Sequence, residues 1–214
     1  EDVDVSGSAF YVMEHVQGLI FVDPALPETD APDRTALYGG LVDTLAAIHE
    51  VDVTAVGLAD YGPPGAYLER QLARWTKQYR ASETGPVPDM EALITGLAKA
   101  LPRDDGTRTL VHGDYRIDNL IFDPDTSQAA AVLDWLLSTI GHPYADLAAL
   151  IMQLQLPPGE YGRGLDGVDR ASLGLLSDDE AIERYCTQRD IAGIADFNVY
   201  LAFAFFRMGC ILQG

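Results

Sequence analysis

Residues 109–134 read TLVHGDYRIDNLIFDPDTSQAAAVLD, and this succession of short apolar runs and turn-forming residues decides the fold of the chain. Residues 109–111 and 119–122 are apolar runs typical of strands, and residues 129–133 form a third such run. Between the second and third runs, residues 123–127 consist of Asp, Pro, Thr and Ser, which favour turns. The stretch therefore predicts a β-hairpin with the tripeptide His-Gly-Asp shortly before it.

Oxygen-bearing side chains stand at the open end of this predicted hairpin. If the turn centres on Thr126 and Ser127, antiparallel pairing places Asn119 opposite Asp134. Asp114 lies just upstream on the same loop, so these oxygen atoms would gather at one end of a rigid hairpin. Hard oxygen ligands of this kind suit Mg²⁺, which binds through one or two carboxylates together with substrate phosphates. The alternative is a solvated turn in which the Asp and Asn residues only cap the backbone.

The remainder of the chain has mainly helical periodicity. Apolar spacing and capping residues predict helices at 37–48, at 67–79, from Asp89 as an N-cap, at 144–154 with Pro143 at the first position, from Ser177 in a capping box with Glu180, and at 199–212. Loops rich in Gly and Pro are predicted at 57–65 and 157–174, and residues 9–13 predict a buried strand. The predicted architecture is α+β, mostly helical around one small hairpin.

The composition indicates a globular chain. Its 214 residues predict one or two domains at about 150 residues each, and 48% hydrophobic residues are enough for a real core.

The 33 acidic against 14 basic residues give a formal net charge of −19, which repels nucleic acid and anionic lipid, so neither is expected as a partner. A cationic substrate would be attracted, but an acidic surface that only keeps the protein in solution is the simpler interpretation. The two cysteines, Cys186 and Cys210, exclude a disulfide scaffold.

No membrane segment is expected either. The longest apolar run, 199–212, is interrupted by Arg207 and is shorter than the roughly 20 residues that a spanning helix needs. The opening residues 1–4, Glu-Asp-Val-Asp, are the reverse of the basic start of a signal peptide. We therefore expect a cytoplasmic protein.

The same stretch carries a family resemblance. Residues 111–119, VHGDYRIDN, fit the H-x-D-x-x-x-x-N catalytic loop of the kinase-like superfamily, and the H-G-D form resembles the aminoglycoside phosphotransferase and choline kinase group. Residues 132–135, VLDW, stand where that family has its second metal-binding Asp, and residues 141–148, GHPYADLA, resemble its G-D-P-x-x-D-L-A segment with His142 in place of the first Asp. The sequence around these motifs most resembles that of kinases associated with acyl-CoA dehydrogenases. The resemblance covers nearly the whole chain.

The resemblance implies a protein-kinase-like fold and a set of site residues. Asp114 would be the catalytic Asp, which orients the attacking hydroxyl and accepts its proton, and Asn119 and Asp134 would hold Mg²⁺ on the phosphates of ATP. Residues 10–18 resemble the hinge of the subgroup, where backbone groups of Glu14 and Val16 would bind the adenine. These roles suit phosphoryl transfer, which needs positioning and charge neutralisation more than covalent chemistry.

Three further residues have supporting roles in this interpretation, each with an alternative. Asp146 would brace the catalytic loop from the start of a helix, or only interact with the helix dipole from its first turn. His112 is expected to support the loop by a hydrogen bond rather than to transfer protons. Arg116 would contact an anionic substrate or a phosphate, or form a structural ion pair.

The sequence does not contain the pattern expected for the small lobe of a kinase. A kinase also needs a small lobe with a Gly-rich loop and a strand lysine, but only about nine residues precede the hinge, and Lys77 and Lys99 are the only lysines and fall in predicted helices. The one literal G-x-G-x-x-G match, 162–167, follows the catalytic loop without a preceding strand, and we interpret it as coincidence. We therefore assign residues 1–18 to the last small-lobe strand and hinge and 19–214 to the large lobe, with the N-terminal lobe missing from this chain.

The function hypothesis is an ATP- and Mg²⁺-dependent phosphotransferase that acts on a hydroxyl of a small molecule. One rival is a degenerate kinase that binds a nucleotide or partner without catalysis, and a second is a metal-dependent hydrolase that uses the same carboxylates. The acceptor stays open at this point: the subgroup resemblance implies a hydroxyacyl-CoA or related hydroxy acid, and the wider family an amino-sugar or amino alcohol. The sequence does not determine the oligomeric state.

Overall fold

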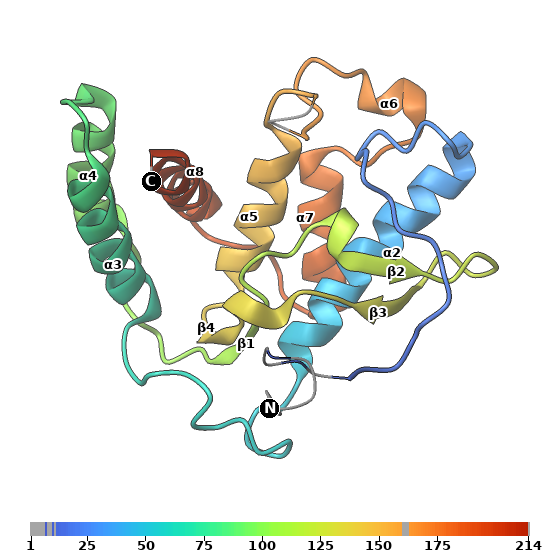
Figure 1. The fold of residues 1–214 in the computed structure, drawn as a ribbon, viewed down its shortest axis with the longest axis horizontal. Coiled ribbons are helices and arrows are strands. Elements are labelled where there is room, and N and C mark those ends of the chain that lie inside the picture. The colour runs from blue at the N-terminus through green and yellow to red at the C-terminus, as the bar shows by residue number, and fades with distance from the viewer. Residues whose placement is uncertain (1–6, 8–9, 11, 160–162, 214) are drawn as a thin grey trace.

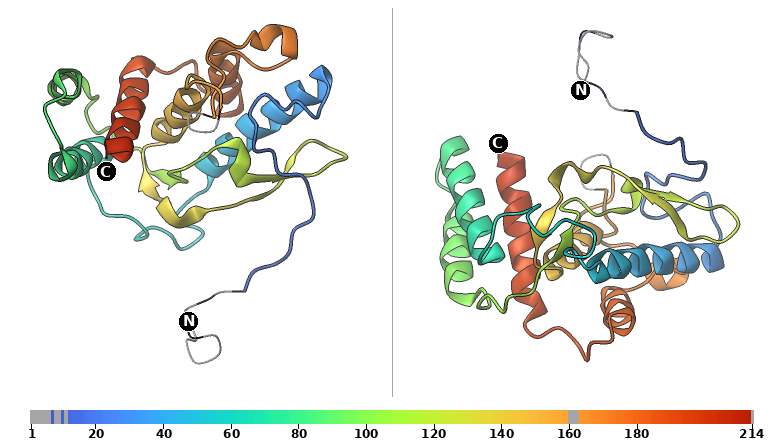
Figure 2. Two further views of the ribbon diagram at one scale, coloured as in Figure 1. Left: turned by 45° about the horizontal axis from the view of Figure 1, so that its top comes forward. Right: turned by 90° about the horizontal axis from the view of Figure 1, so that it is seen from below.

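The computed structural model describes residues 7, 10, 12–159 and 163–213. In Figure 1, α3, α4 and α8 lie together on one side, α2 and α7 lie on the other, and α5 stands between them. The small strands lie below α5 and α2 in this view, and both turned views in Figure 2 keep the same grouping. The α-helices are α2 (Ala31–Glu50), α3 (Tyr67–Ser82), α4 (Pro88–Ala100), α5 (Tyr144–Leu154), α6 (Arg170–Leu173), α7 (Asp178–Gln188) and α8 (Phe197–Gln213). The strands and 3-10 helices are β1 (Thr109–Val111), η1 (Ile117–Asn119), β2 (Leu120–Phe122), β3 (Ala129–Val132), η2 (Trp135–Leu137) and β4 (Thr139–Gly141).

Side chains of the N-cap residues satisfy first-turn amides in α2, α6 and α7, whereas α3, α4 and α5 begin without such a cap. The capping box predicted for α7 is present, because Ser177 and Glu180 each accept a hydrogen bond from the other's backbone amide. The prediction for α4 was wrong in detail: the helix begins at Pro88, so Asp89 lies in its first turn and Val87 is the N-cap. Proline in the first turn needs no amide partner, which explains the earlier start.

The hairpin of β2 and β3 is confirmed, but its register differs by one residue from the prediction. Leu120 pairs with Val132, and the register shifts again between Ile121 and Phe122. The amide of Leu133 donates to the carbonyl of Asn119 at 2.8 Å, so Asn119 faces Leu133 rather than Asp134. The turn also differs from the prediction, because the amide of Asp123 donates to the carbonyl of Gln128 at 2.8 Å, which centres the turn on Asp125 and Thr126, one residue earlier than assumed.

A second sheet was not predicted. The three-residue strands β1 and β4 pair in antiparallel fashion, with Leu110 opposite Ile140. Three residues are too few for a periodic signal, so the pattern did not predict β4. Because β1 leads into His112 and β4 leads into α5, this pairing brings the catalytic loop next to the start of α5. The loop predicted at 157–174 likewise contains the short helix α6.

The N-terminal segment is not the buried strand that was predicted. Ala9 and Tyr11 lie outside the described residues, and Phe10, Val12 and Met13 are exposed and not in a strand. The first strand-like contact comes later in the chain, where Leu19 and Phe122 exchange two backbone hydrogen bonds of 2.8 Å. The assignment of residues 1–18 to a separate lobe and hinge stays a prediction.

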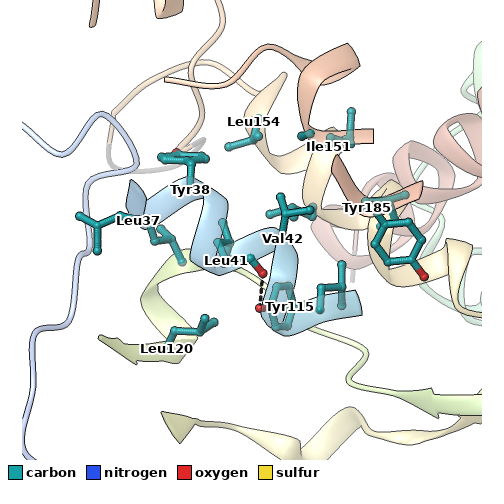
Figure 3. Packing of buried hydrophobic residues seen from close by; sticks show 14 of the residues in the cluster. Leu37, Tyr38, Leu41, Val42, Tyr115, Leu120, Ile151, Leu154 and Tyr185 are labelled. Atoms are coloured by element: carbon teal, nitrogen blue, oxygen red, sulfur yellow. Dashed lines mark hydrogen bonds between the residues drawn. The ribbon is translucent and has the colours of Figure 1, made fainter. Parts of the chain in front are cut away.

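Two hydrophobic clusters share α5. The first packs α2 against β2, α7 and one face of α5, through residues such as Leu41 and Leu147, and Figure 3 shows it with the hydroxyl of Tyr115 donating to the carbonyl of Leu41 at 2.7 Å. The second packs α3, α4 and α8 against the other face of α5, with Trp75 and Phe206 buried in it. A helix buried on two faces is held firmly, so α5 is a rigid support for whatever lies at its N-terminus.

These elements confirm the predicted α+β, mostly helical architecture. Among the described residues, no helix combines the length and the apolar character that crossing a membrane would require.

Candidate active site

The loop that follows β1 is held by one buried carboxylate. Asp146, in the first turn of α5, is 1% exposed, and its two oxygens accept hydrogen bonds from the backbone amides of His112 at 2.6 Å and Gly113 at 2.9 Å. Hydrogen bonds to a charged acceptor are stronger than neutral ones. The carboxylate therefore fixes the backbone one residue before Asp114, which is the contact expected of a bracing residue.

The imidazole of His112 connects the two halves of the site. Its Nε2 lies 2.8 Å from the carbonyl oxygen of Leu133, and its Nδ1 lies 3.2 Å from the amide nitrogen of Asp114. A carbonyl only accepts and an amide N–H only donates, so the ring proton is on Nε2. Both ring nitrogens are therefore engaged in hydrogen bonds to the protein backbone. His112 thus ties the backbone of Asp114 to the residue that precedes Asp134.

Asn119 is brought against Asp114, as the sequence predicted. Its Nδ2 donates to the main-chain oxygen of Asp114 at 2.8 Å and lies 3.5 Å from the carboxylate oxygen Oδ2 of the same residue. Asn119 ends η1 and is paired through its carbonyl with Leu133. The side-chain nitrogen is used for the loop, whereas no described residue donates a hydrogen bond to the side-chain oxygen Oδ1, which is thus available to a ligand.

Asp134 directly follows Leu133, the residue that pairs with Asn119. It is exposed, its backbone is left-handed with φ 59° and ψ 60°, and it immediately precedes η2. In the part of the chain that the structure describes, no group donates a hydrogen bond to its carboxylate. Since Leu133 pairs with Asn119, Asp134 lies one residue beyond Asn119 across the hairpin.

These oxygens fit a magnesium ion that is also held by phosphates. Within the described ranges, no three His, Cys, Asp or Glu residues gather to hold a metal by themselves. Mg²⁺ does not need such a cage, because it keeps waters and takes one or two carboxylates plus substrate phosphates. The side-chain oxygen of Asn119 and the free carboxylate of Asp134 are a donor set of that kind.

The two residues predicted to bind adenine are not in contact with this cluster. Glu14 is exposed and Val16 is partly buried, and both precede the bridge between Leu19 and Phe122. Over the described residues, neither has a hydrogen bond to the catalytic loop or the hairpin. Their role in nucleotide binding stays a prediction.

Arg116 forms the structural ion pair that was one of its two predicted roles. Its Nε and Nη2 donate to the two carboxylate oxygens of Asp118 at 2.5 Å each, and Arg163 reaches the same carboxylate at 3.2 Å. The hydrogen bonds that Arg116 donates to Asp118 raise the pKa of Arg116 above its usual value. Arg116 also lines the pocket described next, and its contact with a substrate stays a prediction.

A pocket opens beside Asp114 between the catalytic loop, α3, α5 and α8. Most of its lining is apolar, and among the described residues Asp114 is the only carboxylate in it, whereas two arginines, Arg116 and Arg207, line it. Tyr67 also lines it, and burial raises the pKa of this phenol to about 12, so it stays neutral. Met152 of α5 and Phe203 of α8 contribute to the apolar part of the lining.

Arg207 was not predicted as a site residue. Its Nη2 donates to the carbonyl oxygen of Gly113 at 2.5 Å, and its guanidinium carbon lies 5.5 Å from the ring centre of Trp75. In the sequence, Arg207 is distinguished only as the single basic residue in the apolar run 199–212. That pattern excluded a membrane span, but it could not show which residue Arg207 contacts.

A row of buried polar groups behind Asp146 was also missed. Arg189, paired with Glu50 at 2.7 Å, donates to the hydroxyl of Tyr185 at 3.1 Å. That hydroxyl lies 2.6 Å from Nδ1 of His49, and Nε2 of His49 lies 3.4 Å from the carboxylate of Asp146. Because Arg189 only donates, the Tyr185 hydroxyl donates onward, and the proton of His49 is on Nε2, facing Asp146. The row runs from the surface to the carboxylate that holds the catalytic loop.

The α+β fold, with the His-Gly-Asp loop placed between β1 and the hairpin, defines a kinase-like protein. The chain belongs to the phosphotransferase enzyme family, whose profile matches residues 1–177. Acyl-CoA dehydrogenase family member 10 of Mus musculus is 45% identical over 215 residues, a match that covers 100% of this chain and 20% of that protein. The chain thus spans about a fifth of the length of this relative.

Solved structures show the same fold. A Ralstonia eutropha protein assigned to the aminoglycoside phosphotransferases has a TM-score of 0.90 at 43% identity, over 94% of this chain and 61% of that one. An aminoglycoside phosphotransferase of Streptomyces rimosus, solved with ADP and streptomycin, has a TM-score of 0.59 at 19% identity, over 88% of this chain and 67% of that one. The second similarity concerns the fold alone.

Proposed function

We propose that the chain carries the catalytic centre of an ATP- and Mg²⁺-dependent phosphotransferase that acts on a hydroxyl of a small molecule. The observation that carries this proposal is the contact of Asn119 with Asp114 at the mouth of the hairpin, where Asp134 follows the residue that pairs with Asn119. These residues come in the order of the family, and the chain belongs to a phosphotransferase family.

In this proposal Asp114 does the proton chemistry. Its carboxylate lines the pocket, so it orients an acceptor hydroxyl there and accepts its proton as the phosphoryl group is transferred. Transfer requires in-line positioning, and the fixed loop supplies it, because the backbone on both sides of Asp114 is hydrogen-bonded to Asp146 and Asn119.

The remaining assignments concern the nucleotide. Asn119 and Asp134 would hold Mg²⁺, which neutralises charge on the phosphates. Backbone groups of Glu14 and Val16 would bind the adenine. The Streptomyces rimosus structure contains ADP, which supports a nucleotide in this family.

The pocket favours one class of acceptor. An amino-sugar or amino alcohol is cationic and would need carboxylates, but the lining has Asp114 alone against Arg116 and Arg207. The apolar lining and the arginines suit a hydroxyacyl-CoA or a related hydroxy acid, and the relatives named as acyl-CoA dehydrogenases support the same class. The overall charge of −19 favours a cation only slightly, because the local charge of the pocket is the opposite.

The test uses the full-length protein with Mg²⁺ and ATP, offered hydroxyacyl-CoA thioesters, free hydroxy acids and amino-sugars in parallel. We expect a phosphorylated hydroxyacyl product by mass spectrometry, which Asp114→Asn abolishes while circular dichroism stays unchanged. Mg²⁺-dependent ATP binding without product from any acceptor would indicate a degenerate kinase, and phosphate release independent of acceptor would indicate a hydrolase. The isolated chain of 214 residues is expected to show little or no turnover.

A further inference from the structure

The two arginines that line the pocket differ in whether a carboxylate of the protein pairs with their charge. Arg116 is paired through two hydrogen bonds with Asp118. For Arg207, by contrast, the described residues provide no carboxylate partner, and its one hydrogen bond is to the carbonyl of Gly113. A guanidinium has several N–H donors in a rigid fork, so Arg207 keeps donors free for the pocket that it lines.

The position of Arg207 links the pocket to the catalytic loop. The side chain is partly buried, packed over the ring of Trp75, and its bond to Gly113 is one residue from Asp114. A partly buried cation without a carboxylate is costly unless a ligand supplies an oxygen. An acceptor oxygen bound here would therefore lie close to the hydroxyl that Asp114 orients.

We propose that Arg207 is a specificity-determining residue that binds a carbonyl or carboxylate oxygen of the acceptor molecule while its Nη2 holds the carbonyl of Gly113. The inference rests on the proposed function for its link to phosphoryl transfer, but the binding itself does not depend on ATP. The acceptor selected in this way carries a hydroxyl and, a few atoms away, a carbonyl or carboxylate group. A plain alcohol of the same chain length lacks the oxygen that Arg207 needs.

A matched control lies on the same ring. The guanidinium carbon of Arg74 is also 5.5 Å from the ring centre of Trp75, but Arg74 is exposed and does not line the pocket. Substitution of Arg74 removes the same kind of packing contact without touching the pocket or the Gly113 carbonyl. If Arg207 only packed on Trp75, the two substitutions would therefore be similar in kind.

The experiment compares full-length wild type, Arg207→Met, Arg207→Lys and Arg74→Met. Two probes of equal chain length are used, a hydroxy acid and the corresponding alcohol that lacks the carboxyl oxygen. Binding is measured by calorimetry without nucleotide, and kcat and KM are measured with Mg²⁺ and ATP. We expect Arg207→Met to weaken hydroxy-acid binding about 10- to 100-fold, the usual effect of losing a charge-assisted hydrogen bond, with alcohol binding changed less than about threefold.

Arg74→Met should leave the ratio of the two affinities at its wild-type value, and Arg207→Lys, which keeps the charge, should recover part of it. An equal loss for both probes, or an unchanged ratio in Arg207→Met, would overturn the proposal and leave Arg207 as a support of the loop only. If wild type binds the hydroxy acid through Arg207 but transfers no phosphate, the proposed function fails while the inference on Arg207 holds.

Discussion

The backbone amide of His112 lies 2.6 Å from a carboxylate oxygen of Asp146, and this hydrogen bond joins the catalytic loop to α5. The helix packs against both hydrophobic clusters, so the loop is attached to the best-supported element of the molecule. The geometry of the site therefore depends on packing far from the pocket, and substitutions that affect this contact should change stability and activity together.

Asp146→Asn should be strongly destabilising. Whichever way the amide is turned, its NH₂ group faces a donor, either the amide of Gly113 or that of His112. Losing a buried charge-assisted hydrogen bond in this way costs about 3 kcal/mol of unfolding free energy. Denaturant unfolding of the full-length protein measures the loss, and phosphate transfer should fall with it.

The matched control for that change is Asp43→Asn. Asp43 forms a two-pronged ion pair with Arg184, but the Arg184 side chain is 42% exposed. Exposed pairs contribute about 1 kcal/mol or less, so this variant should unfold close to wild type. Equal losses at positions 43 and 146 would contradict the role given to the buried carboxylate.

Gly113→Ala should distort the loop at the residue before Asp114. Gly113 has φ +84°, and an added Cβ would lie 2.5 Å from the carbonyl oxygen of Leu137. Gly106 has a similar φ of +81° with nothing within 4 Å, so Gly106→Ala reports the backbone strain alone, about 1 kcal/mol. We expect Gly113→Ala to cost about 2 kcal/mol more than this control and to lose activity, as measured by unfolding and turnover of both variants.

His112→Phe should separate the two halves of the site. An aromatic ring is kept, although it is somewhat larger, but the hydrogen bonds to the carbonyl of Leu133 and from the amide of Asp114 are both lost. We expect lower kcat together with a higher Mg²⁺ concentration for half-maximal rate, because the hairpin residue Asp134 is no longer tied to the loop. A variant with reduced kcat but wild-type Mg²⁺ dependence would show that His112 supports Asp114 alone.

His142 should make the stability depend on pH. Burial lowers the pKa of its imidazole below the usual 6.5, which the nearby Asp105 and Asp104 only partly oppose. The unfolded chain then binds the proton more readily than the folded one, so this contribution is fully present above pH 6.5 and is lost as pH falls through the interval below it. His142→Phe, which can retain the stacking on Tyr200, should show a smaller loss of unfolding free energy between pH 7.5 and pH 5, and parallel profiles would contradict the argument.

The elements that the sequence predicted correctly are those with strong local signals. The capping box at Ser177 and the helical spacing of 67–79 are properties of neighbouring residues, and both are present. Strand β4 and the register of the hairpin were missed because they depend on pairing between segments far apart in the chain or on the shape of one turn. The strand predicted at 9–13 failed for a related reason, since an apolar run becomes a strand only where a partner pairs with it.

The same distinction holds for the candidate site. The loop residues Asp114 and Asn119 and the brace Asp146 occur in motifs, so sequence alone placed them near one another, and the structure reports their contacts. Arg207 and His49 reach the site from helices that are distant in sequence, and only tertiary packing brings them there. No local sequence pattern identifies the contact partner of a single Arg in an apolar helix or of a single His at the end of a helix.

The left-handed backbone of Asp134 sets stability against function at one position. An L-residue in this conformation is strained by about 1 kcal/mol, and glycine relieves that strain. Replacement by glycine would therefore be tolerated or even favoured by the fold, while it deletes the carboxylate proposed to hold the metal. Selection for heat resistance alone would push this residue away from aspartate, and the proposed metal-binding role accounts for the charge at this position.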